Sequence, residues 1–255
     1  MQQHWVRFAE NGREGFGTLE GERVRHWHGN LFEYPERGDR TVALSDVSLL
    51  TPVQPSKVIA LWNNFGALRE KLKLDVPAEP LYLVKTPNTY LEPGGTIRHP
   101  GNGAKIVFEG ELGIVIGQRC KQVSEADAPR YVLGYTCAND VTLAGVVDRD
   151  PSFGQWVRAK GLDTFCPFGP AVATGIDPQQ LVVRTWLDGQ LRQDYPISDM
   201  RFSVAQLVSH ISQDMTLFPG DIILCGTSVG VGSMQPGSTV EVEIAGVGRL
   251  ANRIA

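Results

Sequence analysis

Two glutamates, Glu109 and Glu111, are the residues whose type and spacing first suggest chemistry. They open the stretch 108–117, FEGELGIVIG, whose apolar and β-branched residues are typical of a β-strand. Side chains two positions apart on a strand share one face, so the two carboxylates lie roughly 7 Å apart along it. At that spacing they repel each other and resist burial unless a cation lies between them. The alternative is a strand whose first residues are still in solvent.

A third carboxylate, Asp140, follows another apolar stretch, residues 131–138. The end of a buried strand is a typical place for a metal-binding or catalytic carboxylate. Three carboxylates without a histidine or cysteine partner favour a hard cation, Mg²⁺ first and then Mn²⁺ or Ca²⁺. Such a ligand set leaves coordination positions open for water and for a substrate with two oxygen ligands. Glu109, Glu111 and Asp140 are therefore a candidate metal site.

The elements that must position these carboxylates are expected to be short strands with a few helices between them. Glycine and proline are spread through the chain in turn dipeptides, as in strand-rich folds. An amphipathic helix is predicted at 202–215, a short helix at 66–74 and a capped helix start at 124–127. Strands are predicted at 57–62, 81–85, 108–117 and 131–138, in a hairpin over 181–191 around Asp188-Gly189, and with turns through 219–254.

Residues 1 to about 50 show a separate pattern of short strands, expected at 6–8, 14–19 and 24–28. A proline-containing connector follows, so the chain is predicted to divide into a small β-rich lobe, 1–55, and a catalytic domain, 56–255. His26 and His28 share a strand face in the lobe. Because no third ligand is near, an exposed sheet face is favoured over a metal pair.

The composition excludes several classes of function. The chain has 255 residues and a net charge of −4, with a pI near 5.8, so no general attraction to nucleic acid or anionic membranes is expected. No stretch approaches the ~20 apolar residues of a membrane helix, and the first residues lack a signal-peptide pattern. The four cysteines form no CxxC pair, so they are expected to be reduced thiols of a cytoplasmic protein.

Four ordered blocks of sequence resemble the fumarylacetoacetate hydrolase (FAH) superfamily. They are an E-x-E strand at 108–112, a G-Y-x-x-x-N-D strand at 134–140, a Q-W…K-x-x-D block at 155–170 and a P-G-D…G-T block at 219–227. Each block alone is weak, but the ordered set is specific and covers about 57–254. The resemblance implies a β-rich α+β fold, a mixed β-roll or sandwich with flanking short helices. It also implies a homodimer.

The resemblance also implies roles for individual residues. Glu109, Glu111 and Asp140 would bind Mg²⁺ or Mn²⁺, and the substrate would be a small 2-oxo acid that chelates the metal. Lys160 and Thr227 would contact the substrate or the developing oxyanion, because an ammonium and a hydroxyl can stabilise an enolate. Gln155 would line the site. Further candidates for substrate contacts are Lys85 at a strand end, Asn64 in a polar turn and Asp163 in the K-x-x-D motif.

One departure from the family pattern bears directly on mechanism. Hydrolytic members resemble N-Y-x-x-H-x-x-E at the start of a mobile helix, where His and Glu activate water. Here these two positions are Leu68 and Lys71, and Glu70, one position away, could act as a base only if the helix is rotated. The loop after Asp140 also lacks the usual S-A-R-D run, and Ser228 stands where many members have the proline of G-T-P.

The missing His/Glu pair favours a decarboxylase or isomerase over a hydrolase, because hydrolysis of an acylpyruvate needs a positioned base. These segments resemble the homoprotocatechuate (4-hydroxyphenylacetate) branch, which contains the bifunctional 5-oxopent-3-ene-1,2,5-tricarboxylate decarboxylase/2-hydroxyhepta-2,4-diene-1,7-dioate isomerase. The first hypothesis is thus a metal-dependent decarboxylase or isomerase of a small unsaturated 2-oxo dicarboxylate in aromatic catabolism. The candidates for holding the distal carboxylate are Arg69, Lys71, Lys85 and Arg158.

Two alternatives stay open. One is an acylpyruvate hydrolase of the fumarylpyruvate type, with Glu70 or a metal-bound hydroxide in place of the missing histidine. The other is a catalytically degenerate homologue that binds a 2-oxo acid without turning it over. The retained metal carboxylates and Lys160 argue against the second, although family membership does not guarantee activity.

Overall fold

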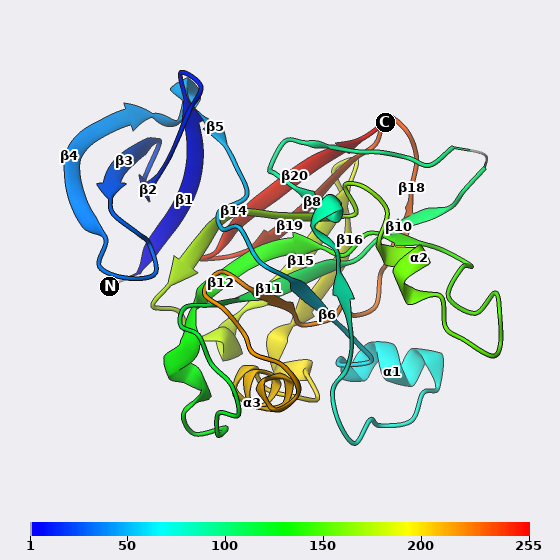
Figure 1. Cartoon of the computed structure of the whole chain (residues 1–255). Helices are drawn as coiled ribbons and strands as arrows, with labels where there is room; N and C mark the ends of the chain where they lie inside the picture. The colour runs from blue at the N-terminus through cyan, green and yellow to red at the C-terminus, as the bar shows by residue number, and fades with distance from the viewer. Residues whose placement is uncertain (1, 102) are drawn as a thin grey trace.

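A long, strongly curved sheet organises the molecule (Figure 1). The computed structural model describes residues 2–101 and 103–255. The sheet has 12 strands, of which β5 (Ser48–Leu49) pairs with β1 and β8 (Tyr90–Leu91) pairs with β14. The remaining strands follow the order β4 (Glu36–Ala43), β3 (Arg23–His28), β2 (Arg13–Glu20), β1 (Gln3–Glu10), β14 (Cys166–Thr174), β12 (Val132–Asn139), β11 (Gly110–Ile116), β17 (Ile222–Leu224), β6 (Val58–Trp62) and β7 (Leu81–Lys85).

Two smaller sheets pack beside the long one. The largest apolar cluster combines side chains from β11 and β12 with side chains from the five-stranded sheet and the helix α3. This packing is the sandwich that the FAH resemblance implied. The five-stranded sheet has the order β16 (Gln190–Pro196), β15 (Val182–Leu187), β19 (Thr239–Ile244), β20 (Gly248–Ile254) and β9 (Thr96–Ile97), and the three-stranded sheet the order β13 (Thr142–Leu143), β10 (Ile106–Phe108) and β18 (Gly232–Met234).

The helices are short and lie at the margins of the sheets (Figure 1). They are α1 (Gly66–Leu72), α2 (Trp156–Lys160) and α3 (Val204–Asp214), with single 3₁₀ turns between strands. The helix α3 begins with a capping box in which Ser203 and Gln206 each bond the other's backbone N–H. The predictions for 66–74 and 202–215 are therefore confirmed to within a few residues.

The prediction of a helix after Ser124 is wrong. The Ser124 hydroxyl does bond to the Asp127 carboxylate, at 2.7 Å, but only the 3₁₀ turn Ala128–Tyr131 follows before strand β12 begins. Pro129 lies in that turn and has no N–H to continue a helix. By contrast, the hairpin predicted around Asp188-Gly189 is confirmed, because β15 and β16 pair antiparallel and both turn residues have positive φ.

The amino-terminal strands join the long sheet directly. Strand β1 pairs antiparallel with β14, with Trp5 opposite Val172, so backbone hydrogen bonds cross from the small lobe to the rest of the chain. The division at residue 55 stays a prediction. The interpretation of the lobe's histidines as exposed is wrong for His26, which packs edge-on against Phe8 and lies 3.5 Å from a Glu10 oxygen.

Two further expectations concern the cysteines and the membrane. All four cysteines are buried free thiols, as expected from their spacing. No helix within residues 2–101 and 103–255 is long and apolar enough to cross a membrane.

Candidate active site

The pairing of strands β11 and β12 brings the three predicted carboxylates together. Gly110 pairs with Asn139, so Glu109 and Asp140 lie side by side just before β11 and just after β12. The backbone N–H of Asp140 donates to the carbonyl of Glu109 at 2.9 Å and fixes this register. Carboxylate oxygens of Glu109, Glu111 and Asp140 all lie within 4.8 Å of one another. We refer to these three residues as the acidic triad.

Glu111 is fully buried, and only one of its two carboxylate oxygens has a hydrogen-bond partner in the described chain. Its Oε2 atom accepts a 2.8 Å hydrogen bond from the backbone N–H of Gly226. Its Oε1 atom has no hydrogen-bond partner among the residues that the structure describes. Burial raises the pKa of Glu111 well above its usual value, and the charges of Asp140 and Glu109 raise it further. An orphaned, buried carboxylate oxygen facing two more carboxylates is the environment expected of a hard-metal site.

Asp140 is held by two buried lysines, one on each oxygen. Lys85 Nζ lies 2.5 Å from Oδ1, and Lys160 Nζ lies 2.5 Å from Oδ2. Burial alone would raise the pKa of Asp140, but the two ammonium groups outweigh it and lower the pKa. Asp140 is therefore ionised, and its orientation is set by groups from two different elements.

Lys160 ends helix α2 and reaches into the middle of the triad. Its Nζ donates to Glu109 Oε2 at 2.9 Å and to Thr142 Oγ1 at 2.7 Å, as well as to Asp140. Burial opposes the charge on Lys160, yet Asp140 and Glu109 more than offset this and raise its pKa. Lys160 forms no ion pair with Asp163, the other charged residue of the K-x-x-D motif, because Lys160 pairs with the triad and Asp163 with Arg98.

A cavity of about 520 Å³ opens above the triad. The helices α1 and α2, which lie at the same end of the long sheet in Figure 1, supply two of its walls. Lys160, Glu109 and Thr227 supply polar groups to its lining, and Lys71 on α1 and Asp148 add two exposed charges. We refer to it as the triad cavity. Its apolar lining consists mainly of Trp62, Leu68, Leu72, Leu74, Val107, Leu143, Val147, Trp156 and Val231.

Three of the predicted substrate contacts lie outside this lining. Asn64 is buried and bonds to the carbonyl of Cys225 and the N–H of Phe202, which anchors the start of α1. Gln155 precedes α2, and its side chain donates to the carbonyl of Phe153. Asp163 is exposed and accepts a bond from Asn88. All three side chains are engaged in hydrogen bonds outside the lining of the triad cavity, and their contact with substrate stays a prediction.

Lys85 and Glu70 also differ from expectation. Lys85 does not reach the cavity mouth as an anion anchor, because its side chain is fully buried and bonded to Asp140. Glu70 lies on the exposed face of α1, whereas Leu68 and Lys71 on the same helix line the triad cavity. Its assignment as a base still requires a rotated helix and stays a prediction.

Two polar residues of the site were missed by sequence reasoning. Thr142 donates to Glu109 Oε1 at 2.7 Å and accepts from Lys160. Gln193, on strand β16, is buried and donates to Thr227 Oγ1 at 2.9 Å while accepting from the N–H of Gly110 at 3.0 Å. Thr142 lies two positions after Asp140 and could have been found from that spacing. No motif or spacing near Gln193 in the sequence indicates that it belongs to the site.

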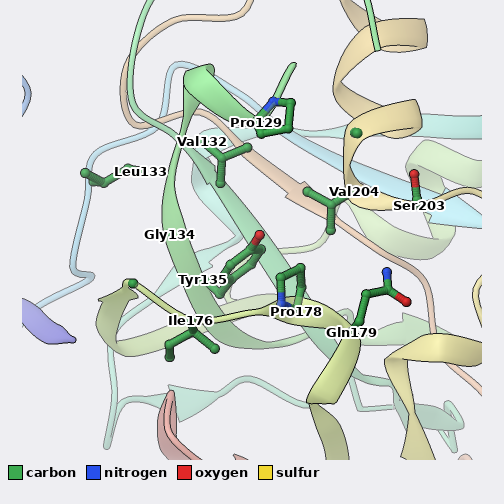
Figure 2. Close-up of a pocket in the computed structure, with 12 residues that line it drawn as sticks. Pro129, Val132, Leu133, Gly134, Tyr135, Ile176, Pro178, Gln179, Ser203 and Val204 are labelled. Carbon is green, nitrogen blue, oxygen red and sulfur yellow. The ribbon is translucent and has the colours of Figure 1, made fainter. Parts of the chain in front are cut away.

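A second hollow, of about 400 Å³, lies beside strand β12, the turn after β14 and the start of α3 (Figure 2). Its labelled side chains are mostly apolar, among them Val132, Ile176 and Val204, with Tyr135 near its centre. No carboxylate, lysine or histidine is among its lining residues in the described part of the chain. Of these two hollows, the triad cavity is therefore the one whose lining includes carboxylates and a lysine beside a candidate metal site.

Comparisons with known proteins identify relatives of both parts of the chain. Residues 57–255 match the family described as fumarylacetoacetate (FAA) hydrolase, C-terminal, and residues 3–52 match the one described as Rv2993c-like, N-terminal. Protein Rv2993c of Mycobacterium tuberculosis is 38% identical over an alignment of 258 positions that covers 97% of this chain and 96% of that protein. The crystal structure of 2-hydroxyhepta-2,4-diene-1,7-dioate isomerase from Mycobacterium marinum is 39% identical and superimposes with a TM-score of 0.90 over 99% of this chain and 98% of that one.

A further relative has a longer chain. The 4-hydroxyphenylacetate degradation bifunctional isomerase/decarboxylase of Salmonella dublin is 38% identical over 200 residues. The match covers 77% of this chain but 46% of that protein. The family match extends through all the strands that carry the acidic triad and through Lys160 and Thr227. The chain therefore belongs to the fumarylacetoacetate hydrolase family.

Proposed function

We propose that the chain is a divalent-metal-dependent isomerase or decarboxylase of a small unsaturated 2-oxo dicarboxylate in the catabolism of aromatic compounds. The observation that carries the proposal is the triad cavity itself. It joins three clustered carboxylates, two of them fully buried, and Lys160 to an open cavity, while Leu68 and Lys71 occupy the wall where water-activating residues were expected. Relatives named as isomerases and as isomerase/decarboxylases of 4-hydroxyphenylacetate degradation support the reaction class.

The residues present fit a divalent cation. Members of this family usually bind one, and the acidic triad offers three oxygen ligands. Three carboxylates and two lysines leave one net negative charge, and the free Oε1 atom of Glu111 has no other partner in the described chain. Mg²⁺ or Mn²⁺ held by Glu109, Glu111 and Asp140 would act as a Lewis acid toward a 2-oxo acid.

Lys160 is placed to stabilise the anion that either reaction produces. In decarboxylation, the C–C bond to the departing carboxylate breaks, its electron pair forms the enolate, and carbon dioxide leaves before a proton adds to carbon. In isomerisation, a 2-hydroxydiene loses its O–H proton and gains one on carbon, so the double bonds shift without a change in composition. Both pass through an enolate, which the Lys160 ammonium can stabilise by hydrogen bonding and charge. The Thr227 hydroxyl lines the same space.

The opposite wall of the cavity suits a second carboxylate. Lys71 lines the space from α1, and most other side chains around it are apolar. A carbon chain would therefore lie against the apolar wall with its far carboxylate toward Lys71. Among the four cations considered from sequence, Lys71 alone belongs to the described lining of the triad cavity.

One observation favours the hydrolytic alternative. Asp148 lines the triad cavity and is exposed, so it could take a proton from a water molecule in place of the missing histidine. Hydrolysis of fumarylpyruvate would break the C–C bond between the fumaryl carbonyl carbon and the methylene carbon of the pyruvate part, adding OH to the first and H to the second, and would give one fumarate and one pyruvate for each water consumed.

Product analysis separates these functions. The purified chain is incubated with Mg²⁺ or Mn²⁺ and, in turn, with 2-hydroxyhepta-2,4-diene-1,7-dioate, oxaloacetate and fumarylpyruvate. A shift in the ultraviolet spectrum without new acids, or release of carbon dioxide, supports the proposal. Stoichiometric fumarate and pyruvate would establish the hydrolase instead. Metal-dependent binding of all three without turnover would identify a degenerate homologue.

A further inference from the structure

The two lysines on Asp140 differ in their surroundings. Lys85 ends strand β7, its side chain is fully enclosed, and Asp140 is its one ion-pair partner within the described residues. Lys160 contacts Glu109 and Thr142 as well as Asp140, and it lines the triad cavity. The Lys85 ammonium is therefore buried on the side of Asp140 away from the triad cavity, whereas the Lys160 ammonium lies between Asp140 and the cavity.

This difference matters because Asp140 is buried. If Lys160 were its sole partner, moving the Lys160 ammonium toward a substrate would leave a buried carboxylate without a counter-charge, which is strongly unfavourable. With Lys85 on Oδ1, Asp140 keeps one charged partner when Oδ2 is released. Lys160 can then exchange its bond with Asp140 for one with a bound anion at little cost.

We propose that Lys85 is a positioning residue that holds Asp140 so that Lys160 is free to turn toward the carboxylate or the developing enolate of a bound 2-oxo acid. This inference rests on the proposed function of the triad cavity. Lys85 itself touches neither the cavity nor the substrate. Its effect is transmitted through Asp140 to Lys160.

The test replaces Lys85 and measures two ligands separately. Mn²⁺ binding is followed by electron paramagnetic resonance, and oxalate, a stable mimic of the enolate of pyruvate, is titrated into the Mn²⁺-loaded protein by calorimetry. Lys85→Met should leave the Mn²⁺ dissociation constant within about threefold, because the cation can itself neutralise Asp140. Oxalate affinity should fall about 30-fold and kcat about 100-fold, the usual effect of losing one oxyanion donor.

Two further single variants control for structural damage. Lys85→Gln keeps a hydrogen-bond donor for Asp140 without the charge, so its oxalate affinity should lie between those of the wild type and Lys85→Met. Lys57→Met removes another Lys–Asp pair of 2.5 Å, formed with the buried Asp221 outside the triad cavity. It should lower the melting temperature without changing the affinity for Mn²⁺ or oxalate.

A double variant tests transmission through Lys160. In a Lys160→Met background, Lys85→Met should change oxalate affinity less than about twofold, because residues acting as one unit are non-additive. The inference would be overturned if Lys85→Met lowered oxalate affinity equally in the wild-type and Lys160→Met backgrounds. It would also be overturned if Lys85→Met lowered the affinities for Mn²⁺ and oxalate in parallel. If the wild type turns over none of the 2-oxo acids but the oxalate pattern holds, the proposed function fails and the role of Lys85 stands. If the wild type is active and Lys85→Met, like Lys57→Met, changes neither affinity, the proposed function stands and the proposed role of Lys85 is wrong.

Discussion

Glu111 and Gly226 are joined by a 2.8 Å hydrogen bond from the backbone N–H of Gly226 to Oε2 of the carboxylate. Gly226 adopts a positive φ of 88°, which glycine tolerates without strain, and it lies next to Thr227. The bond fixes one oxygen of a fully buried carboxylate and leaves the other without a partner in the described chain. The free oxygen belongs to the acidic triad, so the loop that carries Thr227 also orients a proposed metal ligand.

Replacing Glu111 by glutamine should separate metal binding from folding. The variant keeps the size of the side chain but removes a carboxyl group whose ionised form is disfavoured by burial and by the charges of Asp140 and Glu109. We expect the affinity for Mn²⁺ to fall at least about 100-fold, in line with the loss of one ligand, while the metal-free protein becomes more stable by about 1 kcal/mol. Calorimetric titration and melting curves with and without Mn²⁺ measure both effects. Glu125→Gln, at an exposed position, is the matched control, and unchanged metal affinity in Glu111→Gln would remove Glu111 from the site.

Metal binding should release a proton and weaken in acid. Burial, with Asp140 and Glu109, raises the pKa of Glu111 well above its usual 4.5 in the metal-free protein. Its contribution to stability is therefore complete below that usual value and is lost as pH rises through the raised pKa. A bound cation requires the ionised form, so it displaces the proton and binds more tightly as pH increases. Titrations in two buffers of different ionisation enthalpy should show about one proton released per Mn²⁺ bound. Identical heats in both buffers would contradict this.

The sequence predicted the acidic triad because its members lie on strands with a readable pattern. Glu109 and Glu111 precede a continuous apolar run, and Asp140 ends another, so residue type and strand position were enough to make them candidates. Their proximity follows from the pairing of β11 with β12, which was seen only in the structure. Lys85 was expected at the cavity mouth because its own strand ends there. Its true partner, Asp140, lies 55 residues away and depends on how distant strands are ordered.

The limits of prediction are also clear on α1. Helical positions differ by about 100° per residue, so a seven-residue helix gives too few repeats to fix which face is inward. Both Glu70 and Lys71 are exposed, and tertiary packing decides that Lys71, not Glu70, lines the triad cavity. The role of Gln193 is similar, because its contact with Gly110 spans 83 residues and two sheets.

Gln193 should be essential for the position of Thr227. Its amide donates to Thr227 Oγ1 and to the carbonyl of Ser228, and it accepts from Gly110. Gln193→Ala removes these three buried hydrogen bonds and leaves the Thr227 hydroxyl with only its bond to the carbonyl of Gly110 within the described residues, so we expect a loss of about 2–3 kcal/mol in the free energy of unfolding. The Michaelis constant should rise as the Thr227 hydroxyl loses its orientation. Urea denaturation and steady-state kinetics measure these effects. Gln190→Ala, exposed on the same strand, should stay within about 0.5 kcal/mol of the wild type.

Lys71 should decide whether the enzyme prefers a second carboxylate on its substrate. It lines the triad cavity from α1, whereas Lys73, which caps the same helix, is exposed and outside the lining. Lys71→Met removes a charge-assisted bond to the distal carboxylate, so kcat/KM for 2-hydroxyhepta-2,4-diene-1,7-dioate should fall about tenfold. Lys71→Glu should lower it further, because a like charge repels the same carboxylate.

The comparison that isolates this effect uses a substrate without the second carboxylate. For 2-hydroxypenta-2,4-dienoate, kcat/KM should change less than about threefold in both Lys71 variants, since the lost bond is made only by the longer diacid. Lys73→Glu changes the net charge by as much as Lys71→Glu does and should leave kcat/KM unchanged for both substrates. That result would exclude a general effect of charge on substrate capture. Equal losses with both substrates would mean that Lys71 acts on the reacting end of the molecule. Specificity for the distal carboxylate would then have to come from another cation.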